Sequence, residues 1–291
     1  MSILTDIFRF LVFSNFWISI AAAGYSMLTV YQLDLEVPSG FYWFVGCCTL
    51  CSYCLQRYLQ FSYRKKKQSI RQNWLVGNRL YVGGTILAAG IAGAILGLTI
   101  LTPVQILCFI PISLISMFYS IRVLGRSKKS KRSKSQGLRG LPGVKIFMVA
   151  ISWSFLCGLM PIWISGFSGM DLLQIILVCL EKLFFIIAIT IPFDIRDLKY
   201  DQVSNNTIPQ VFGATRSIYI ANGLLLVAAL CAVFSGVYSA EVLTGLMLSY
   251  ATTMIVLLYV DEEKPELYYS GLIDATIVFQ LLFVLGAVNL L

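Results

Sequence analysis

The chain has 291 residues, of which 58% are apolar and only 12% charged, and its mean hydropathy is +0.81. Soluble domains carry about 25% charged residues, so this composition excludes an ordinary soluble protein and predicts a helical protein that crosses a membrane many times. The formal net charge is +8. Because the basic run 126–134 has no interleaved aromatic residue, it predicts contact with anionic lipid headgroups and no nucleic-acid partner.

Nine segments are apolar over about 20 residues, the length that a spanning helix needs. The predicted spans are roughly 8–31, 41–62, 80–101, 103–123, 144–166, 171–193, 217–238, 240–260 and 269–291. The segment Met1–Asp6 has no basic region and the first apolar run is long enough to span, so we expect no cleavable signal peptide. The sequence therefore predicts an all-α integral membrane protein with one transmembrane domain, residues 1–291.

The distribution of basic residues supports this count of helices. If nine spans alternate in direction, every Lys and Arg except Lys182 lies at or near loops of one face. The basic loops of that face cover about 63–79 and 122–145, and a third loop, about 194–216, carries acidic residues. By the positive-inside rule this face is cytoplasmic, with the N-terminus in the cytoplasm and the C-terminus outside.

Three carboxylates lie at the cytoplasmic end of the sixth predicted span. Asp194, Asp197 and Asp201 are spaced at i, i+3 and i+7, which places them on one face of a helix. Carboxylate oxygens in this setting suit a hard divalent cation that takes a diphosphate as its other ligand. The alternative interpretation is a solvated acidic helix end.

These features together resemble the UbiA superfamily of intramembrane aromatic prenyltransferases. The resemblance is carried by nine helices, by the three spaced aspartates and by Thr207-Ile-Pro209 followed by Gly213. It implies a lateral, lipid-facing cavity for the tail of a polyprenyl diphosphate, and two acidic motifs that hold Mg²⁺ against the diphosphate. Ionisation of the allylic C–O bond would give a carbocation that a small, aromatic acceptor captures. The metal neutralises charge on the leaving diphosphate, and a dry cavity protects the cation.

The resemblance extends to the loop after the fourth predicted span. There Tyr119, Arg139 and Lys145 resemble the family's Tyr and basic residues near the diphosphate. The resemblance thus implies catalytic roles for Tyr119 and Lys145. It implies substrate binding for Arg139, and we expect the same of Lys199 beside the acidic motif.

The first acidic motif of the family is missing. The matching region, 53–60, contains Gln56 and Arg57 but no acid, and no Asp or Glu occurs between Glu36 and Asp171. One Mg²⁺ site would then remain, and a cation would do the electrostatic work of the second. Arg57 is the predicted catalytic cation, with Gln56 as a substrate-binding neighbour, because guanidinium groups pair with phosphate oxygens. The alternative for Arg57 is a helix-end cation that reaches the interface.

Other polar residues lie inside the predicted spans. Asn15 either lines the substrate pocket or bonds across helices, and we assign it to substrate binding. We expect the charges of Glu181 and Lys182 to be neutralised by contacts between helices, for example by an ion pair of Lys182 with an acid on a neighbouring helix. Asp274 is a candidate for the polar end of the cavity. Ala89, Gly93 and Gly97, at four-residue spacing, predict a close helix crossing.

The leading functional hypothesis is a membrane protein that binds a polyprenyl diphosphate through Mg²⁺ and transfers the prenyl group to a small acceptor. The alternatives are a non-catalytic isoprenoid-binding relative, a terpene-cyclising enzyme and a transporter. The spans show no evident inverted repeat or pair of broken helices, which argues against the transporter.

Overall fold

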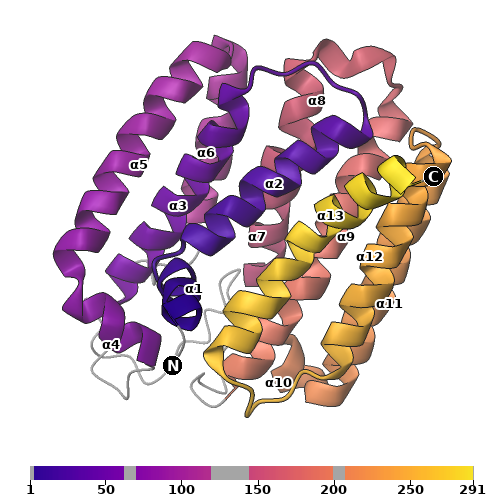
Figure 1. Cartoon of the computed structure of the whole chain (residues 1–291). Coiled ribbons are helices and arrows are strands. Elements are labelled where there is room, and N and C mark those ends of the chain that lie inside the picture. The colour runs from indigo at the N-terminus through magenta and orange to yellow at the C-terminus, as the bar shows by residue number, and fades with distance from the viewer. Residues whose placement is uncertain (1–2, 62–69, 119–143, 199–206, 291) are drawn as a thin grey trace, which may run out of the picture.

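The computed structural model describes residues 3–61, 70–118, 144–198 and 207–290, and the regular elements in these ranges are helices (Figure 1). The first half comprises α1 (Ile3–Phe13), α2 (Phe16–Gln32), α3 (Gly40–Phe61), α4 (Ile70–Gly77), α5 (Arg79–Ile100) and α6 (Pro103–Phe118). The second half comprises α7 (Val144–Trp153), a π-helical turn (Ser154–Leu159), α8 (Met160–Ile164), α9 (Leu172–Asp197), α10 (Ile208–Phe212), α11 (Ala214–Ser235), α12 (Ala240–Leu258), a second π-helical turn (Tyr268–Ile273) and α13 (Asp274–Leu290).

Six helices of the described chain are long and apolar enough to cross a membrane, and the bent pair α1–α2 raises the number to seven if it is one span. The six are Arg79–Ile100, Lys145–Ile164, Leu172–Asp197, Ala214–Ser235, Ala240–Leu258 and Tyr268–Leu290. The helix α6 is apolar but shorter. The chain is therefore a multi-pass, all-helical membrane protein, and the count of nine spans stays a prediction.

Three predicted elements differ from the structure. The first predicted span is not one helix, because the chain bends by 74° between α1 and α2. Asn15 lies at this break with a positive φ of 67°, a conformation that Asn tolerates better than most residues. The predicted basic loop 63–79 contains the short helix α4, and the predicted loop 194–216 contains α10.

The long helix α9 lies at the centre of the second half. An Asp171 capping box begins it: the carboxylate accepts from the backbone N–H of Gln174, and Gln174 accepts from the backbone N–H of Asp171. Its apolar side chains Phe185, Ile187 and Ile191 are buried, and the helix packs against α7 and α11. Because α9 is covered on several sides, it carries its last turn, with Asp194 and Asp197, into the interior of one end of the bundle.

Small residues let two pairs of helices approach closely. Ala89, Gly93 and Gly97 are buried on α5 where it packs against α3, which confirms the predicted close crossing. Gly245 on α12 is tighter still, since an added Cβ would lie 2.5 Å from the Cα of Val284 on α13.

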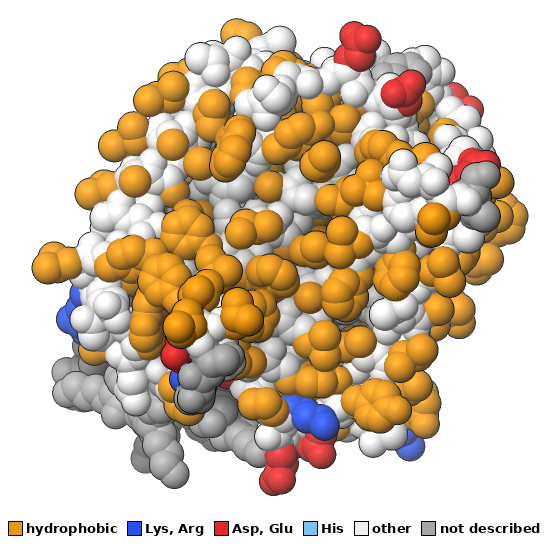
Figure 2. All heavy atoms as spheres, viewed as in Figure 1, with side chains coloured by type: hydrophobic (Ala, Val, Ile, Leu, Met, Phe, Trp, Pro, Cys, Tyr) orange, Lys and Arg blue, Asp and Glu red, His pale blue; other side chains and the backbone are white. Residues whose placement is uncertain are grey.

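Charged and apolar side chains separate along the long axis of the molecule. In the view of Figure 2, apolar side chains cover the middle of the visible face, and the Lys and Arg side chains lie near its lower part. The two termini lie at opposite ends of the bundle (Figure 1). This arrangement matches a protein whose middle faces lipid and whose ends face water.

Candidate functional site

Two of the three predicted metal-binding aspartates lie in the last turn of α9. The Asp194 side chain is only 3% exposed, and its Oδ1 lies 3.6 Å from Nζ of Lys145 on α7. The Asp197 side chain is 29% exposed, and its Oδ1 accepts a hydrogen bond of 2.8 Å from Nε of Arg196. Neither carboxylate is a freely solvated helix end, and each lies beside a cation.

The structure tests only part of the predicted acidic motif. The helix α9 ends at Asp197, so the helical spacing is observed for Asp194 and Asp197. Asp201 lies outside the described residues, as do three other predicted site residues, Tyr119, Arg139 and Lys199. In the part of the chain that the structure describes, no group of three Asp, Glu, His or Cys side chains comes together as a metal site.

The two described carboxylates nevertheless suit Mg²⁺ in their chemistry. Magnesium is usually held by one or two carboxylates together with substrate phosphates and water, so a complete protein cage is not required. Asp194 and Asp197 offer oxygen donors one turn apart, and both already lie in a site arranged for ionised groups. The residues thus fit an ion that arrives together with a diphosphate, with Lys145 and Arg196 as competing partners.

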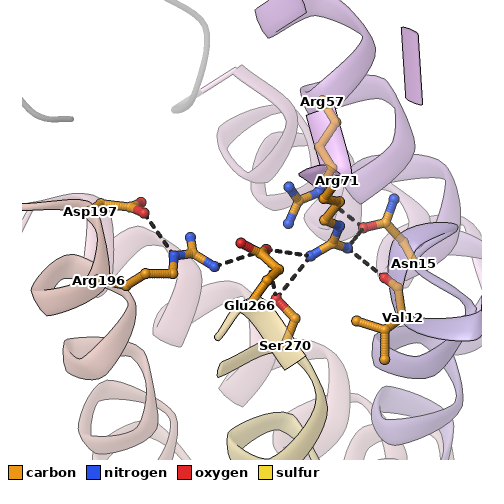
Figure 3. Close-up of polar contacts among 8 residues, drawn as sticks. All are labelled: Val12, Asn15, Arg57, Arg71, Arg196, Asp197, Glu266 and Ser270. Carbon is orange, nitrogen blue, oxygen red and sulfur yellow. Dashed lines mark hydrogen bonds and ion pairs between the residues drawn. The ribbon is translucent and has the colours of Figure 1, made fainter. Parts of the chain in front are cut away.

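A cluster of arginines lies beside these aspartates, and we call Arg57, Arg71, Arg196 and Glu266 the mouth cluster. One oxygen of Glu266, Oε1, lies 3.4 Å from Nη1 of Arg71 and 3.2 Å from Nη1 of Arg196 (Figure 3). Burial by itself would raise the pKa of the Glu266 carboxyl, but Arg196, Arg71 and Arg57 hold that pKa below its usual range. Glu266 therefore remains an anion that draws together arginines from α4 and α9.

Arg71 is the most completely bonded of these arginines. Its Nη1 donates to Oγ of Ser270 (2.9 Å), and its Nη2 donates to the carbonyl of Val12 (2.7 Å) and to Oδ1 of Asn15 (2.8 Å). Burial and the neighbouring Arg57 lower the pKa of Arg71, but a guanidinium stays protonated at neutral pH. Val12 lies in the last turn of α1, so Arg71 bonds a carbonyl next to the break between α1 and α2. Arg71 thus ties the N-terminal segment to the C-terminal helix pair.

Asn15 connects Arg71 to the predicted catalytic cation. Its Oδ1 also accepts from Nε of Arg57 (3.1 Å), and its Nδ2 donates to Sγ of Cys54 (3.4 Å). Asn15 is fully buried. Asn15 therefore forms hydrogen bonds across helices, which was one of the two interpretations of its sequence position. These bonds orient Arg57 at the end of α3.

Gln56 lies next to a cavity rather than among the arginines. Its Nε2 donates to the carbonyl of Ser116 (2.6 Å) and to Oγ of Ser52 (3.2 Å). Ser52 and Ser116 line an apolar cavity of about 490 Å³ between α3, α5, α6 and the α7 segment. Tyr53, one turn before Arg57, lines the same cavity.

The rest of the cavity lining is apolar or small. It includes Phe44, Cys48, Gly93, Gly97, Leu101, Phe109, Trp153 and Leu156. An apolar cavity with a few serines at one end has the character expected for a lipid tail, and sequence analysis predicted the tail site only through the family resemblance.

Three residues of the site were not predicted from sequence. Glu266 precedes the last predicted span, Arg71 was counted only toward the basic face, and Arg196 only as a loop residue. Arg196 also lies over the rings of Phe193 and Tyr269, at 5.2 and 5.7 Å. Asp274, at the start of α13, adds negative charge near Arg71 and Arg196. Sequence alone offered one indication of these residues: charged side chains are rare in so apolar a chain, and rare charges in membrane proteins are often functional.

A second charged group lies near the middle of α9, and we call Glu181 and Lys182 the sealed pair. Both are 0% exposed, and Nζ of Lys182 lies 3.0 Å from Oε2 of Glu181. Lys182 also donates to Oε1 of Gln32 (3.0 Å), and the Tyr250 hydroxyl donates to Glu181. The predicted ion pair between Lys182 and an acid on a neighbouring helix is wrong. Lys182 pairs with the adjacent Glu181, and the neighbouring helices supply the uncharged partners Gln32 and Tyr250.

Comparison with solved structures identifies the fold. An apo structure of a UbiA homolog from Aeropyrum pernix K1 superposes with a TM-score of 0.61 at 10% identity, covering 93% of this chain and 96% of that chain. A structure from work on digeranylgeranylglyceryl phosphate synthase in membranes gives 0.57 at 13% identity, covering 97% and 98%. The chain has a UbiA-like fold. No family model matches the sequence, and no curated protein matches it.

The UbiA-like fold confirms the resemblance found in the sequence. At this level of identity the similarity concerns the fold over nearly the whole chain, and the site must be judged from its own residues. Those residues keep two acids at the end of α9, while the position of the missing acidic motif holds Gln56 and Arg57.

Proposed function

We propose that this protein is a membrane prenyltransferase-like enzyme that binds a polyprenyl diphosphate at the end of α9 and transfers the prenyl group to a small, aromatic acceptor. The observation that carries the proposal is that a UbiA-like fold brings together two acids beside cations at the end of α9 and holds Arg57 one helical turn beyond Tyr53, which lines an apolar cavity. The similar solved structures, a UbiA homolog and one from work on digeranylgeranylglyceryl phosphate synthase, support the same substrate class.

The donor would bind with its tail in the cavity and its diphosphate at the mouth cluster. Asp194, Asp197 and Asp201 would hold one Mg²⁺, which when bound supplies positive charge to the leaving diphosphate. Lys145 and Arg196 already lie beside Asp194 and Asp197, so they would contact the same phosphate oxygens. Nine spans with a cytoplasmic N-terminus would place this site on the cytoplasmic side.

The chemistry is a substitution at the allylic carbon. The C–O bond to the diphosphate breaks and the diphosphate leaves with the electron pair. The acceptor forms a new bond to the allylic carbon and releases a proton to solvent. The cations at the mouth stabilise the leaving group, and the apolar cavity keeps water away from the carbocation.

A specific observation favours a second candidate, a non-catalytic isoprenoid-binding protein. No acid occurs from residue 37 to residue 170, so the first half of the chain supplies no carboxylate for a second metal. Such a protein would retain the donor site and lack turnover.

Binding of labelled geranylgeranyl diphosphate to the detergent-purified protein tests the donor site. We expect Mg²⁺ to strengthen binding and Asp197→Asn to weaken it by about tenfold or more in Mg²⁺. Asp171→Asn is the matched control, because it lies at the opposite end of α9 and Asn caps a helix as well as Asp. Binding that ignores both Mg²⁺ and Asp197→Asn overturns the site assignment. Release of diphosphate on addition of an acceptor distinguishes an enzyme from the binding protein.

A further inference from the structure

Arg57 differs from every other charged residue at the mouth. Its Nε donates to Asn15, but among the residues that the structure describes it forms no ion pair, and its terminal nitrogens donate no hydrogen bond. Arg71 and Arg196 both contact Glu266, and Arg196 also contacts Asp197. Within the described ranges, Arg57 is thus a half-buried cation whose two terminal nitrogens have no anionic partner.

A single amide oxygen holds Arg57 close to a second cation. Oδ1 of Asn15 accepts from Arg57 and from Arg71 at 3.1 and 2.8 Å, so two guanidinium groups share one neutral acceptor. Two like charges in a partly buried site repel each other unless an anion lies between or beside them. Glu266 is the neighbouring anion of Arg71. No acid of the described residues makes direct contact with Arg57.

The direction of Arg57 points to the occupant of this space. Figure 3 shows Arg57, Arg71 and Arg196 approaching Glu266 from three helices, with the Arg57 guanidinium on the side of Glu266 and Arg196. Tyr53, one turn earlier on α3, lines the apolar cavity. An anion at Arg57 would therefore lie between the cavity and the acidic end of α9.

We propose that Arg57, oriented by Asn15 and backed by Arg71, is a metal-independent subsite for the proximal phosphate of the prenyl diphosphate, the one joined to the tail. This inference rests on the proposed function and extends it: one phosphate would be held by Asp194 and Asp197 through Mg²⁺, and the other by guanidinium alone. A planar guanidinium with two terminal nitrogens matches two oxygens of a phosphate. Arg57 is the group that contacts the phosphate, while Asn15 is a positioning residue.

The test measures binding of geranylgeranyl diphosphate and geranylgeranyl monophosphate, each with Mg²⁺ and with EDTA. In EDTA the wild-type protein is expected to keep measurable affinity for both ligands, because both carry the proximal phosphate. Arg57→Gln is expected to weaken the binding of both by about tenfold or more in EDTA, while Mg²⁺ still strengthens the remaining binding of the diphosphate. Arg216→Gln, which removes an exposed cation from α11, is the matched control and is expected to change neither quantity.

The outcomes separate this subsite from the proposed function. If Arg57→Gln leaves the affinity for both ligands in EDTA unchanged, the subsite is wrong, even if Asp197→Asn still abolishes the effect of Mg²⁺. If Arg57→Gln weakens the binding of the diphosphate alone, the contact is with the distal phosphate and the assignment to the proximal one is overturned. If the wild-type protein binds neither ligand under any condition, the proposed function itself fails. Thermal unfolding of Arg57→Gln shows whether its loss of binding reflects a loss of fold; we expect the fold to persist, because no acid of the described residues forms an ion pair with Arg57.

Discussion

The helix α9 carries charged residues at two depths, and their surroundings differ. The sealed pair, Glu181 and Lys182, is 0% exposed and satisfies itself: acid and base are adjacent, and Gln32 and Tyr250 complete the contacts. The mouth cluster is partly open and has a cation, Arg57, that no described acid neutralises. The charges of the sealed pair neutralise each other and leave no group free to bind a ligand. A charge held in place without an ion pair, such as Arg57 among the described residues, can still bind an anionic ligand.

The largest effect is expected at the sealed pair. Lys182→Met removes the partner of a fully buried carboxylate, and breaking such a pair costs about 3–5 kcal/mol of unfolding free energy. The Glu181→Gln/Lys182→Met double variant leaves no buried charge and should recover much of this loss. Thermal unfolding in detergent measures both. Equal stability of the Lys182→Met single variant and the wild type would show that the pair is not a structural element.

A smaller loss is expected at the fully bonded arginine of the mouth. Arg71→Gln leaves Glu266, Ser270 and the Val12 carbonyl with fewer partners, and we expect about 2–4 kcal/mol of destabilisation. The exposed Arg79→Gln on the neighbouring helix α5 is the control and should change the melting temperature little. A stable Arg71→Gln protein would mean that the bend between α1 and α2 does not depend on this contact.

Acid should weaken the mouth through Glu266. Because its folded pKa lies below the unfolded value, its carboxylate contributes stability above the unfolded pKa, and this contribution is lost as pH falls through the folded pKa. We therefore expect the melting temperature of the wild type to fall more steeply below about pH 5 than that of Glu266→Gln. Parallel curves for the two proteins across that range would contradict the role of Glu266 as an anion between arginines.

The smallest effect on stability is expected at Arg57, together with a large effect on binding. Arg57→Gln removes a cation that repels Arg71. The free energy of unfolding should therefore stay within about 1 kcal/mol of the wild-type value or rise, as measured by thermal unfolding in detergent. A marked destabilisation would place Arg57 with Arg71 as a structural residue and remove the contrast on which the ligand argument depends.

Much of the fold could be predicted from sequence, because membrane spans are defined by length and apolarity. The predicted spans 41–62, 80–101 and 240–260 differ from α3, α5 and α12 by two residues or fewer at each end. The bend at Asn15 could not be predicted, since the buried carbonyl of Val12 beside it is bonded by Arg71, which lies 59 residues away in sequence. No local pattern reports such a contact.

The candidate site was predicted in part. Asp194, Asp197, Arg57 and Lys145 were found from motif spacing and from the resemblance, and the structure places Lys145 beside Asp194. Glu266 was missed because its importance comes from two arginines that reach it from α4 and α9, 195 and 70 residues away. Pairings over such separations are properties of the folded bundle and not of any segment.

Pulsed electron paramagnetic resonance with Mn²⁺ in place of Mg²⁺ tests the central claim most directly, because it detects phosphorus next to the bound ion. With geranylgeranyl diphosphate present, the account predicts a manganese–phosphorus coupling in the wild type and in Arg57→Gln, and its loss in Asp197→Asn. A wild-type spectrum without that coupling, or an unchanged coupling in Asp197→Asn, would contradict the assignment of the end of α9 as the place where a metal ion holds the diphosphate.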